Sequence, residues 1–325
     1  MDSSADLTPR RAALLAHDLV SNVERALRGK PDVIVRAVVA LIAQGHLLLE
    51  DVPGVGKTTL ARALARSLDA SFHRIQFTSD LLPSDLTGLT VPEMHDGRPT
   101  GAFRFQPGPV FANVVLADEI NRASPRSQSA LLEAMAERTV SIDGVTHELP
   151  DPFFVVATQN PIEHHGTHEL PESQLDRFLI RLALGYPDAE HEAQVVRDDP
   201  AATSLPSLTP VVTLAELRGM QRVARDVKFE DSLVRYLLEI VHATREHDAL
   251  ALGISTRGAV ALRRAAQSHA LIDGRDYCIP EDVSGLTVDV CAHRIATRLP
   301  GGAAPAAEET QWILRDILAS TAVPL

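Results

Sequence analysis

The chain has 325 residues, of which 45% are hydrophobic and 23% charged, with a formal net charge of −12. This length and ordinary globular composition predict two domains, and the acidic balance argues against broad binding to nucleic acid, whose affinity comes chiefly from Lys and Arg that neutralise phosphates. The chain contains no apolar run long enough to cross a membrane and opens without the apolar segment of a signal peptide, so we expect no membrane span and a cytoplasmic protein.

The first two-thirds of the chain alternates helical and strand patterns. We expect two helices, at about 11–27 and 32–43. They are followed by a strand at 46–50, a Gly/Pro turn at 51–56 and a third helix at 57–68. Further short apolar strands are expected at 72–77, 113–117, 153–158 and 178–184. Strands that alternate with helices predict an α/β fold with a mostly parallel sheet that is covered on both faces.

Two insertions interrupt this alternation, and both are predicted to form projecting hairpins. Residues 89–105 are polar and punctuated by Gly and Pro. Residues 139–149 alternate around Asp143 and Gly144, a favoured two-residue hairpin turn.

The character of the chain changes after Pro187. A polar, Pro-rich connector leads to four helix-like segments with no convincing strand between them, at about 214–224, 231–244, 256–271 and 280–296. A last amphipathic segment contains Trp312. We therefore predict an α/β core at 1–190, a connector at 191–212, and an all-α domain with a C-terminal helix at 213–325.

The strongest chemical signal is a phosphate-binding loop between a predicted strand and a predicted helix, as this motif requires. It consists of Pro53, Gly54, Val55, Gly56, Lys57, Thr58 and Thr59. The glycines let backbone N–H groups curl around the phosphates of ATP, Lys57 neutralises the β and γ oxygens, and the Thr58 hydroxyl holds Mg²⁺. Asp51 departs from the usual pattern because it stands where the first glycine belongs, and an acid there repels a triphosphate unless it points away.

An apolar strand that ends in two acids is the second signal. It runs from Val114 to Glu119, about sixty residues after the phosphate loop. Asp118 is expected to bind Mg²⁺, mostly through water, and Glu119 to polarise the attacking water. Another apolar strand ends at Asn160, whose amide could orient that water or contact the γ-phosphate, an Asn-Pro turn being the alternative.

Together these segments resemble the MoxR family of AAA+ ATPases over nearly the whole chain. The likeness rests on residues 49–58, 77–88, 108–113, 117–123, 128–135, 175–178 and 255–258. The resemblance implies an AAA+ core with a helix-2 insertion at 89–105, a hairpin before sensor 1 at 139–149, and an α-helical lid. It also implies that Asn160 is the sensor 1 residue, Arg177 the arginine finger and Arg257 the sensor 2 residue. Gly29 and Lys30 fall where the family lines the adenine pocket.

The same resemblance implies a homo-oligomeric ring, expected to be a hexamer, that hydrolyses ATP and remodels a partner protein. Relatives of this type are thought to act with von Willebrand A domain proteins in complex maturation or metal-cofactor insertion. An arginine finger from a neighbouring subunit stabilises charge on the γ-phosphate only in the assembled ring. For Arg177, the alternative role is a salt bridge at a helix end. For Arg257, the alternative is a structural role at the start of a helix. Whether Arg257 serves the nucleotide of its own subunit or of a neighbour stays open.

Three other functions stay open. The ATPase subunit of a magnesium or cobalt chelatase shares the same two insertions. A nucleic-acid motor is disfavoured by the acidic balance and by an aromatic content of only 4%, which leaves few rings to stack on bases. The third is a scaffold protein that changes shape when it binds nucleotide but hydrolyses little of it. Asp51 is the only residue that favours this function.

Overall fold

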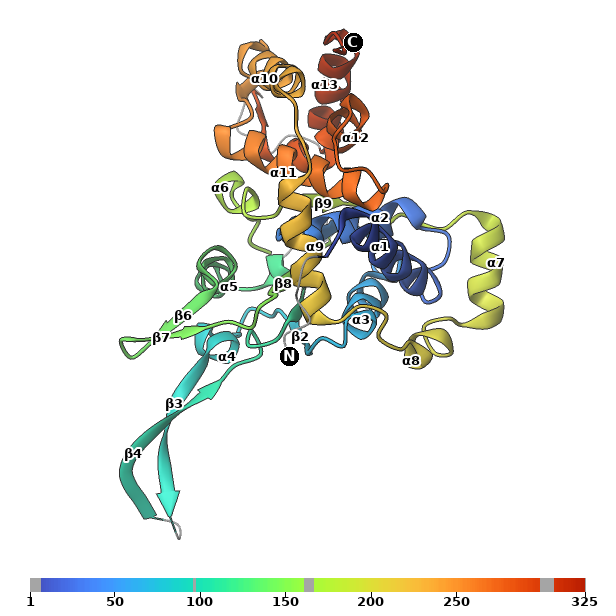
Figure 1. Cartoon of the computed structure of the whole chain (residues 1–325). Helices are drawn as coiled ribbons and strands as arrows, with labels where there is room; N and C mark the ends of the chain where they lie inside the picture. The colour runs from blue at the N-terminus through green and yellow to red at the C-terminus, as the bar shows by residue number, and fades with distance from the viewer. Residues whose placement is uncertain (1–6, 96–97, 161–166, 299–306, 325) are drawn as a thin grey trace.

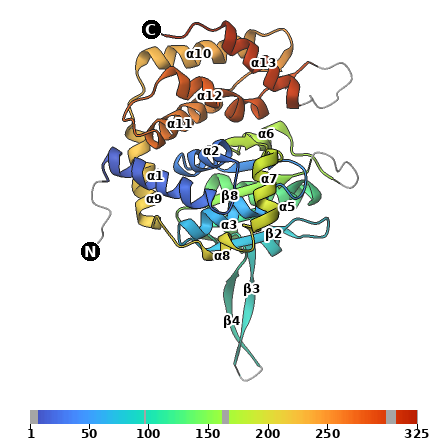
Figure 2. The same cartoon turned by 90° about the vertical axis from the view of Figure 1, so that its right-hand side faces the viewer.

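The computed structural model describes residues 7–95, 98–160, 167–298 and 307–324. An α/β core occupies the middle of the molecule, a helical domain stacks on one side of it, and a long hairpin projects from the opposite side (Figures 1 and 2). Among the described residues, no helix combines the length and apolar character that a membrane span requires.

A parallel sheet of five strands forms the centre of the core. In spatial order its strands are β2 (Phe72–Gln76), β5 (Val114–Asp118), β8 (Phe154–Gln159), β1 (Leu47–Glu50) and β9 (Ile180–Leu182). All four neighbouring pairs run parallel, which confirms the predicted sheet. The carboxyl ends of β1, β5 and β8 therefore meet at one edge, where open α/β sheets bind their ligands.

Alternation along the strands divides the apolar side chains between the two faces of the sheet. In β1, Leu47 and Leu49 join the cluster on one face, whereas Leu48 joins the cluster on the other. The first face is covered by α1 (Pro9–Glu24), α2 (Pro31–Ile42) and α3 (Lys57–Ser67). The second is covered by α4 (Pro83–Thr87) and α5 (Pro125–Glu137).

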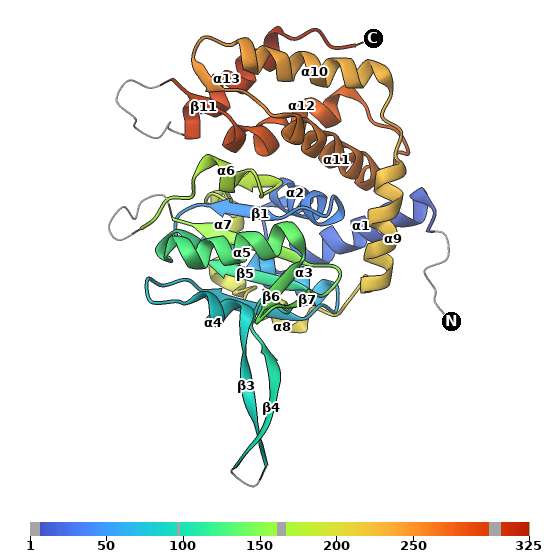
Figure 3. The same ribbon diagram turned by 90° about the vertical axis from the view of Figure 1, so that its left-hand side faces the viewer.

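Both predicted hairpins are present. The long one pairs β3 (Gly88–His95) with β4 (Arg98–Pro107), and the short one pairs β6 (Thr139–Ile142) with β7 (Val145–Glu148). Figure 3 shows β3 and β4 extending away from the core. Asp143 and Gly144 have φ of 51° and 79°, the positive values that a two-residue type I′ turn needs.

The second domain is helical with one small exception. Its helices are α9 (Leu214–Asp226), α10 (Asp231–Glu246), α11 (Thr256–Ile272), α12 (Pro280–Cys291) and α13 (Ala307–Ser320). The sequence predicted no strand here, but β10 (Leu250–Leu252) pairs antiparallel with β11 (Ala296–Thr297). Strands this short carry too few residues to show an alternating pattern. The polar stretch before α9 also contains two helices, α7 (Ala189–Asp198) and α8 (Ser204–Ser207).

One hydrophobic core runs from the sheet into the helical domain. The cluster that contains Leu47 continues through α2 and α11 and reaches Leu237 in α10. Three ion pairs among the described residues also join the domains: Arg36 with Asp289, Arg294 with Asp176, and Arg257 with Asp176. The helical domain is therefore packed firmly against the core, in addition to being joined to it by the chain.

Candidate functional site

The phosphate loop forms the turn between β1 and α3. Gly54 and Gly56 have φ of 87° and 102°, in the left-handed region that glycine adopts without strain. A Cβ atom at Gly56 would also lie 2.7 Å from Leu27 Cδ1. α3 begins at Lys57, so the N–H groups of its first turn face the loop, an arrangement that attracts anions.

Lys57 lies across the carboxyl ends of two neighbouring strands. Its Nζ donates to the main-chain oxygen of Asp51 at 2.6 Å and to that of Gln159 at 3.4 Å. These residues follow β1 and end β8, so the ammonium group sits at the edge of the sheet beside the loop. It is placed to neutralise phosphate oxygens held there.

The carboxylate of Asp51 points away from the phosphate loop. Asp51 Oδ1 accepts from the backbone N–H of Val52 at 2.7 Å, and Oδ2 accepts from that of Gly185 at 2.6 Å. The acid therefore ties the start of the loop to the segment after β9. The repulsion expected from the sequence is reduced because both oxygens accept from backbone N–H groups and Asp51 does not line the pocket that the phosphate loop borders.

Asp51→Gly, which restores the usual phosphate-loop pattern, is expected to destabilise the protein without tightening ATP binding. The change removes two acceptors from partly buried N–H groups, at a cost of about 1–3 kcal/mol in the free energy of unfolding. Urea unfolding measures the loss, and a fluorescent ATP analogue measures affinity. Tighter nucleotide binding with unchanged stability would show that Asp51 acts mainly through repulsion.

Thr158 joins the acidic end of β5 to β8. Its hydroxyl donates to Asp118 Oδ1 at 2.6 Å and accepts from the backbone N–H of Glu119 at 2.9 Å. Asp118 Oδ2 accepts from Arg74 Nη2 at 2.7 Å. The Asp118 carboxylate is thus oriented from two sides at the edge of the sheet.

Glu119 is held in a defined orientation by its backbone and by two side chains. Its φ of 58° lies in the left-handed region, which is unfavourable for a residue with a Cβ atom. Glu119 Oε2 accepts from Gln76 Nε2 at 2.8 Å and from Arg122 Nη1 at 2.9 Å. The carboxylate is therefore directed by contacts from β2 and from the turn that follows β5.

The phosphate loop and the acids border one open pocket of about 350 Å³. Its lining residues are Pro53, Gly54, Gly56, Lys57, Thr58, Thr59, Arg74, Asp118, Glu119 and Asn160. The pocket unites the residues predicted from the phosphate loop and from the ends of β5 and β8, apart from Val55, which is 8% exposed and packs in the core. The Thr58 hydroxyl and the Asp118 carboxylate supply the oxygen ligands that Mg²⁺ prefers, so these residues fit that ion.

Arg74, Gln76, Arg122 and Thr158 are site residues that the sequence analysis did not single out. Arg74 and Gln76 lie on β2, which is the neighbour of β5 in the sheet. Both alternate to the same side of that strand and so reach the two acids. Spacing along the chain gives no sign of this, because strand order is a property of the folded sheet.

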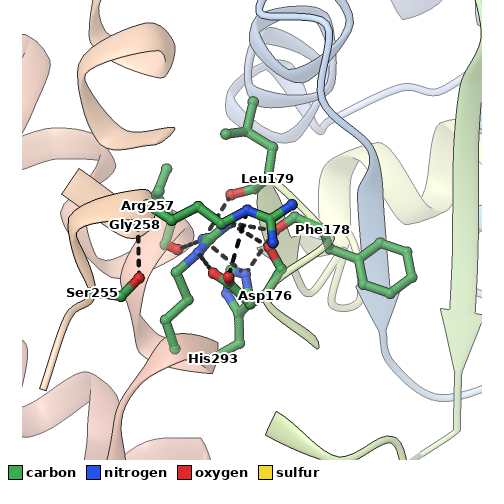
Figure 4. Close-up of polar contacts among 9 residues, drawn as sticks. Asp176, Phe178, Leu179, Ser255, Arg257, Gly258 and His293 are labelled. Atoms are coloured by element: carbon green, nitrogen blue, oxygen red, sulfur yellow. Dashed lines mark hydrogen bonds and ion pairs between the residues drawn. The ribbon is translucent and has the colours of Figure 1, made fainter. Parts of the chain in front are cut away.

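The two predicted arginines lie at a second cavity, of about 520 Å³. Arg177 and Arg257 border it together with Arg138, Arg264, Arg294 and Asp176. Arg177 Nη1 donates to the main-chain oxygen of Leu132 at 2.6 Å, and Arg257 Nε lies 3.8 Å from Asp176 Oδ2 (Figure 4). Among the described residues, none borders both this cavity and the phosphate-loop pocket.

The residues predicted to contact adenine do not border the phosphate-loop pocket. Gly29 and Lys30 precede α2, and Lys30 Nζ donates to the main-chain oxygen of Tyr186 at 2.6 Å. Tyr186 follows Gly185, the residue that Asp51 binds. One segment after β9 therefore contacts both the start of the phosphate loop and the start of α2.

Comparison with known proteins agrees with these features. The profile of the ATPase family associated with various cellular activities (AAA) matches residues 46–180, and that of the AAA lid domain matches 242–317. A crystal structure of a protein from Cytophaga hutchinsonii superposes with a TM-score of 0.86 at 36% sequence identity, over 97% of this chain and 96% of that one.

Relatives with similar sequences span most of the chain. Bacillus subtilis YeaC is 46% identical over 94% of both proteins. Chaperone MoxR1 of Mycobacterium tuberculosis is 42% identical over 85% of this chain and 74% of its own length. Protein MoxR of Methylorubrum extorquens is 33% identical over 84% of this chain and 85% of its own. The chain therefore belongs to the MoxR family of AAA+ ATPases and is an ATP-hydrolysing enzyme.

Proposed function

We propose that this ATPase works as a ring, assembled from copies of the chain, in which each ATP lies between two subunits. The observation that carries the proposal is the division of the site. The phosphate loop and both acids border one cavity, whereas Arg177 and Arg257 border another. We call the cavity bordered by Arg177 and Arg257 the arginine cavity. A complete site then requires that the arginine cavity of one subunit faces the phosphate-loop pocket of the next.

Within one subunit, the phosphate-loop pocket holds the triphosphate and positions the water. Lys57 neutralises phosphate oxygens, and Thr58 and Asp118 would hold Mg²⁺, which would supply positive charge to the triphosphate. Glu119 takes the proton of the attacking water, and Asn160 orients that water from the end of β8. Pro53, Gly54, Val55, Gly56 and Thr59 shape the loop, with Val55 acting through its backbone. Gly29 and Lys30 border the adenine.

Arg177 and Arg257 both act on the nucleotide of a neighbouring subunit. In hydrolysis, negative charge spreads over the γ-phosphate oxygens, and a guanidinium group stabilises it with several directed donors. The Arg257 side chain is 69% exposed, so it can reach out of its own subunit. This assignment makes turnover depend on subunit contacts, as a ring machine requires.

The work done by the ring is the remodelling of a partner protein. One relative carries the name chaperone, and it is 42% identical to this chain over 85% of this chain's length. We infer a hexamer that acts in the cytoplasm with a von Willebrand A domain protein, in complex maturation or metal-cofactor insertion. The long hairpin β3–β4 offers an accessible surface for such a partner, since Phe103 and Met94 on it are 67% and 59% exposed.

Capture of the partner by an ATP-locked ring tests this role. Glu119→Gln rings held in ATP are expected to retain a partner that is released on exchange into ADP, because the locked state persists without hydrolysis. The partner is identified by mass spectrometry, with Lys57→Ala as the control that does not hold ATP. Recovery of the same proteins by both variants would argue against ATP-driven remodelling.

A further inference from the structure

Arg294 is a buried arginine of the lid whose side chain binds the segment that contains Arg177. It lies in the turn η2 (Ala292–Arg294) after α12, and its side chain is 3% exposed. Arg294 Nε donates to Asp176 Oδ1 at 2.7 Å. The guanidinium group also donates to the main-chain oxygens of Asp176, Phe178 and Leu179, at 3.3, 2.6 and 3.2 Å. Arg294 therefore holds the chain on both sides of Arg177.

Packing alone does not account for an arginine at this place. Burial disfavours the charged form and lowers the pKa of Arg294 below its ordinary value. A buried guanidinium group is tolerated only when its donors are paired, and here Asp176 and the main-chain oxygens pair them. An apolar side chain of similar volume would fill the space without this desolvation cost, but it could not hold the backbone of residues 176–179.

Asp176 connects Arg294 to Arg177 and Arg257. While its Oδ1 accepts from Arg294, its Oδ2 lies 3.8 Å from Arg257 Nε. Figure 4 shows Arg257 reaching from the lid toward Asp176, with Phe178 and Leu179 beside it. Arg177 follows Asp176 directly and anchors to the main-chain oxygen of Leu132 at 2.6 Å. All three arginines border the same cavity.

We propose that Arg294 is a positioning residue which, through Asp176 and the neighbouring backbone, presents Arg177 and Arg257 in one fixed arrangement to the nucleotide of the adjacent subunit. The proposal rests on the trans role given to Arg177 under the proposed function. Arg294 belongs to the lid, whereas Arg177 belongs to the core. A change in the position of the lid is therefore transmitted directly to the arginine finger.

Arg294→Lys tests this role, because an ammonium group keeps the charge but cannot bind a carboxylate and several carbonyls in a fork. The variant is expected to lower kcat by about 10–100-fold, the effect of moving a catalytic group by about 1 Å. Its Kd for ATP stays unchanged, since its own phosphate loop is intact. Mixing with Lys57→Ala subunits restores turnover, because these neighbours supply an undisturbed Arg177.

Recovery on mixing separates positioning from a purely structural role. A lid defect that harms the variant's own nucleotide site would not be repaired by a neighbour, so loss of kcat without recovery overturns the proposal. Arg36→Lys is the matched control, since it alters a lid–core ion pair that does not involve Asp176 and is expected to leave kcat near wild type. Circular dichroism and thermal unfolding show whether each variant is folded.

Asp176→Asn is the second variant, for the case in which Arg294→Lys does not fold. It removes the charge shared by Arg294 and Arg257 and is expected to show the same loss and the same recovery. If both variants keep wild-type kcat while Arg177→Ala is inactive, the positioning role is refuted and the proposed function stands. If Arg177→Ala itself keeps full activity, the trans assignment fails and the positioning role falls with it.

Discussion

Glu119→Gln is expected to lower kcat for ATP by about 10²–10⁴-fold, the range for loss of a general base. The amide has the same shape as the carboxylate but cannot take a proton from water. Its oxygen can still accept from Gln76 and Arg122, so the pocket keeps its geometry. The Kd for ATP should therefore stay close to the wild-type value, since Lys57 and the loop are untouched.

Phosphate release under saturating ATP measures kcat, and equilibrium titration with a fluorescent ATP analogue measures Kd. Glu239→Gln is a matched control, because it makes the same exchange at an exposed position on α10. A Glu119→Gln enzyme that turns over as fast as wild type would remove Glu119 from the mechanism. A large rise in Kd with unchanged kcat would give it a binding role instead.

Arg177→Ala is expected to abolish most turnover and to regain it when mixed with Lys57→Ala subunits. An arginine finger contributes about 10³–10⁵-fold to turnover. In a random equal mixture, about a quarter of the head-to-tail interfaces join an intact phosphate loop to an intact finger, so about a quarter of wild-type activity should return if interfaces act independently. Both parent variants should be nearly inactive alone.

A chain with both substitutions controls for the mixing experiment. Lys57→Ala subunits mixed with the double variant contain no intact phosphate loop, so no activity should return. The same mixing with Arg257→Ala decides whether Arg257 serves a neighbour, as the geometry of the arginine cavity suggests, or its own subunit. If rings that are verified to be mixed do not recover ATPase activity, Arg177 acts on the ATP of its own subunit.

The sheet and the phosphate-loop pocket could be predicted because their signals are local. Apolar runs bounded by Gly, Pro or acids mark β1, β5 and β8; β5 and β8 end at or next to a residue of the pocket, and β1 leads into the phosphate loop that lines it. The contacts of Arg74 and Gln76 could not be predicted, since they depend on β2 lying beside β5. The direction of the Asp51 carboxylate depends on Gly185, which is 134 residues away in sequence.

The lid illustrates the same limit on a larger scale. Helical periodicity predicts its main helices, but nothing in that pattern indicates that Arg294 is buried against the segment after α6 (Glu172–Leu175). A single Arg near a helix end is most often a solvated side chain. Only tertiary packing shows that this one is paired with Asp176 and four main-chain oxygens.

The long hairpin β3–β4 has two unpaired edges, which in an exposed ribbon invite strand addition and aggregation. Proline lacks the N–H group that such pairing needs, and Pro92, Pro99 and Pro107 all lie in this ribbon. The charged side chains of Glu93, Arg98 and Arg104 are also exposed along it. The ribbon can therefore extend into solvent without pairing with other ribbons, and a partner that binds it would be contacted by its side chains rather than by its backbone.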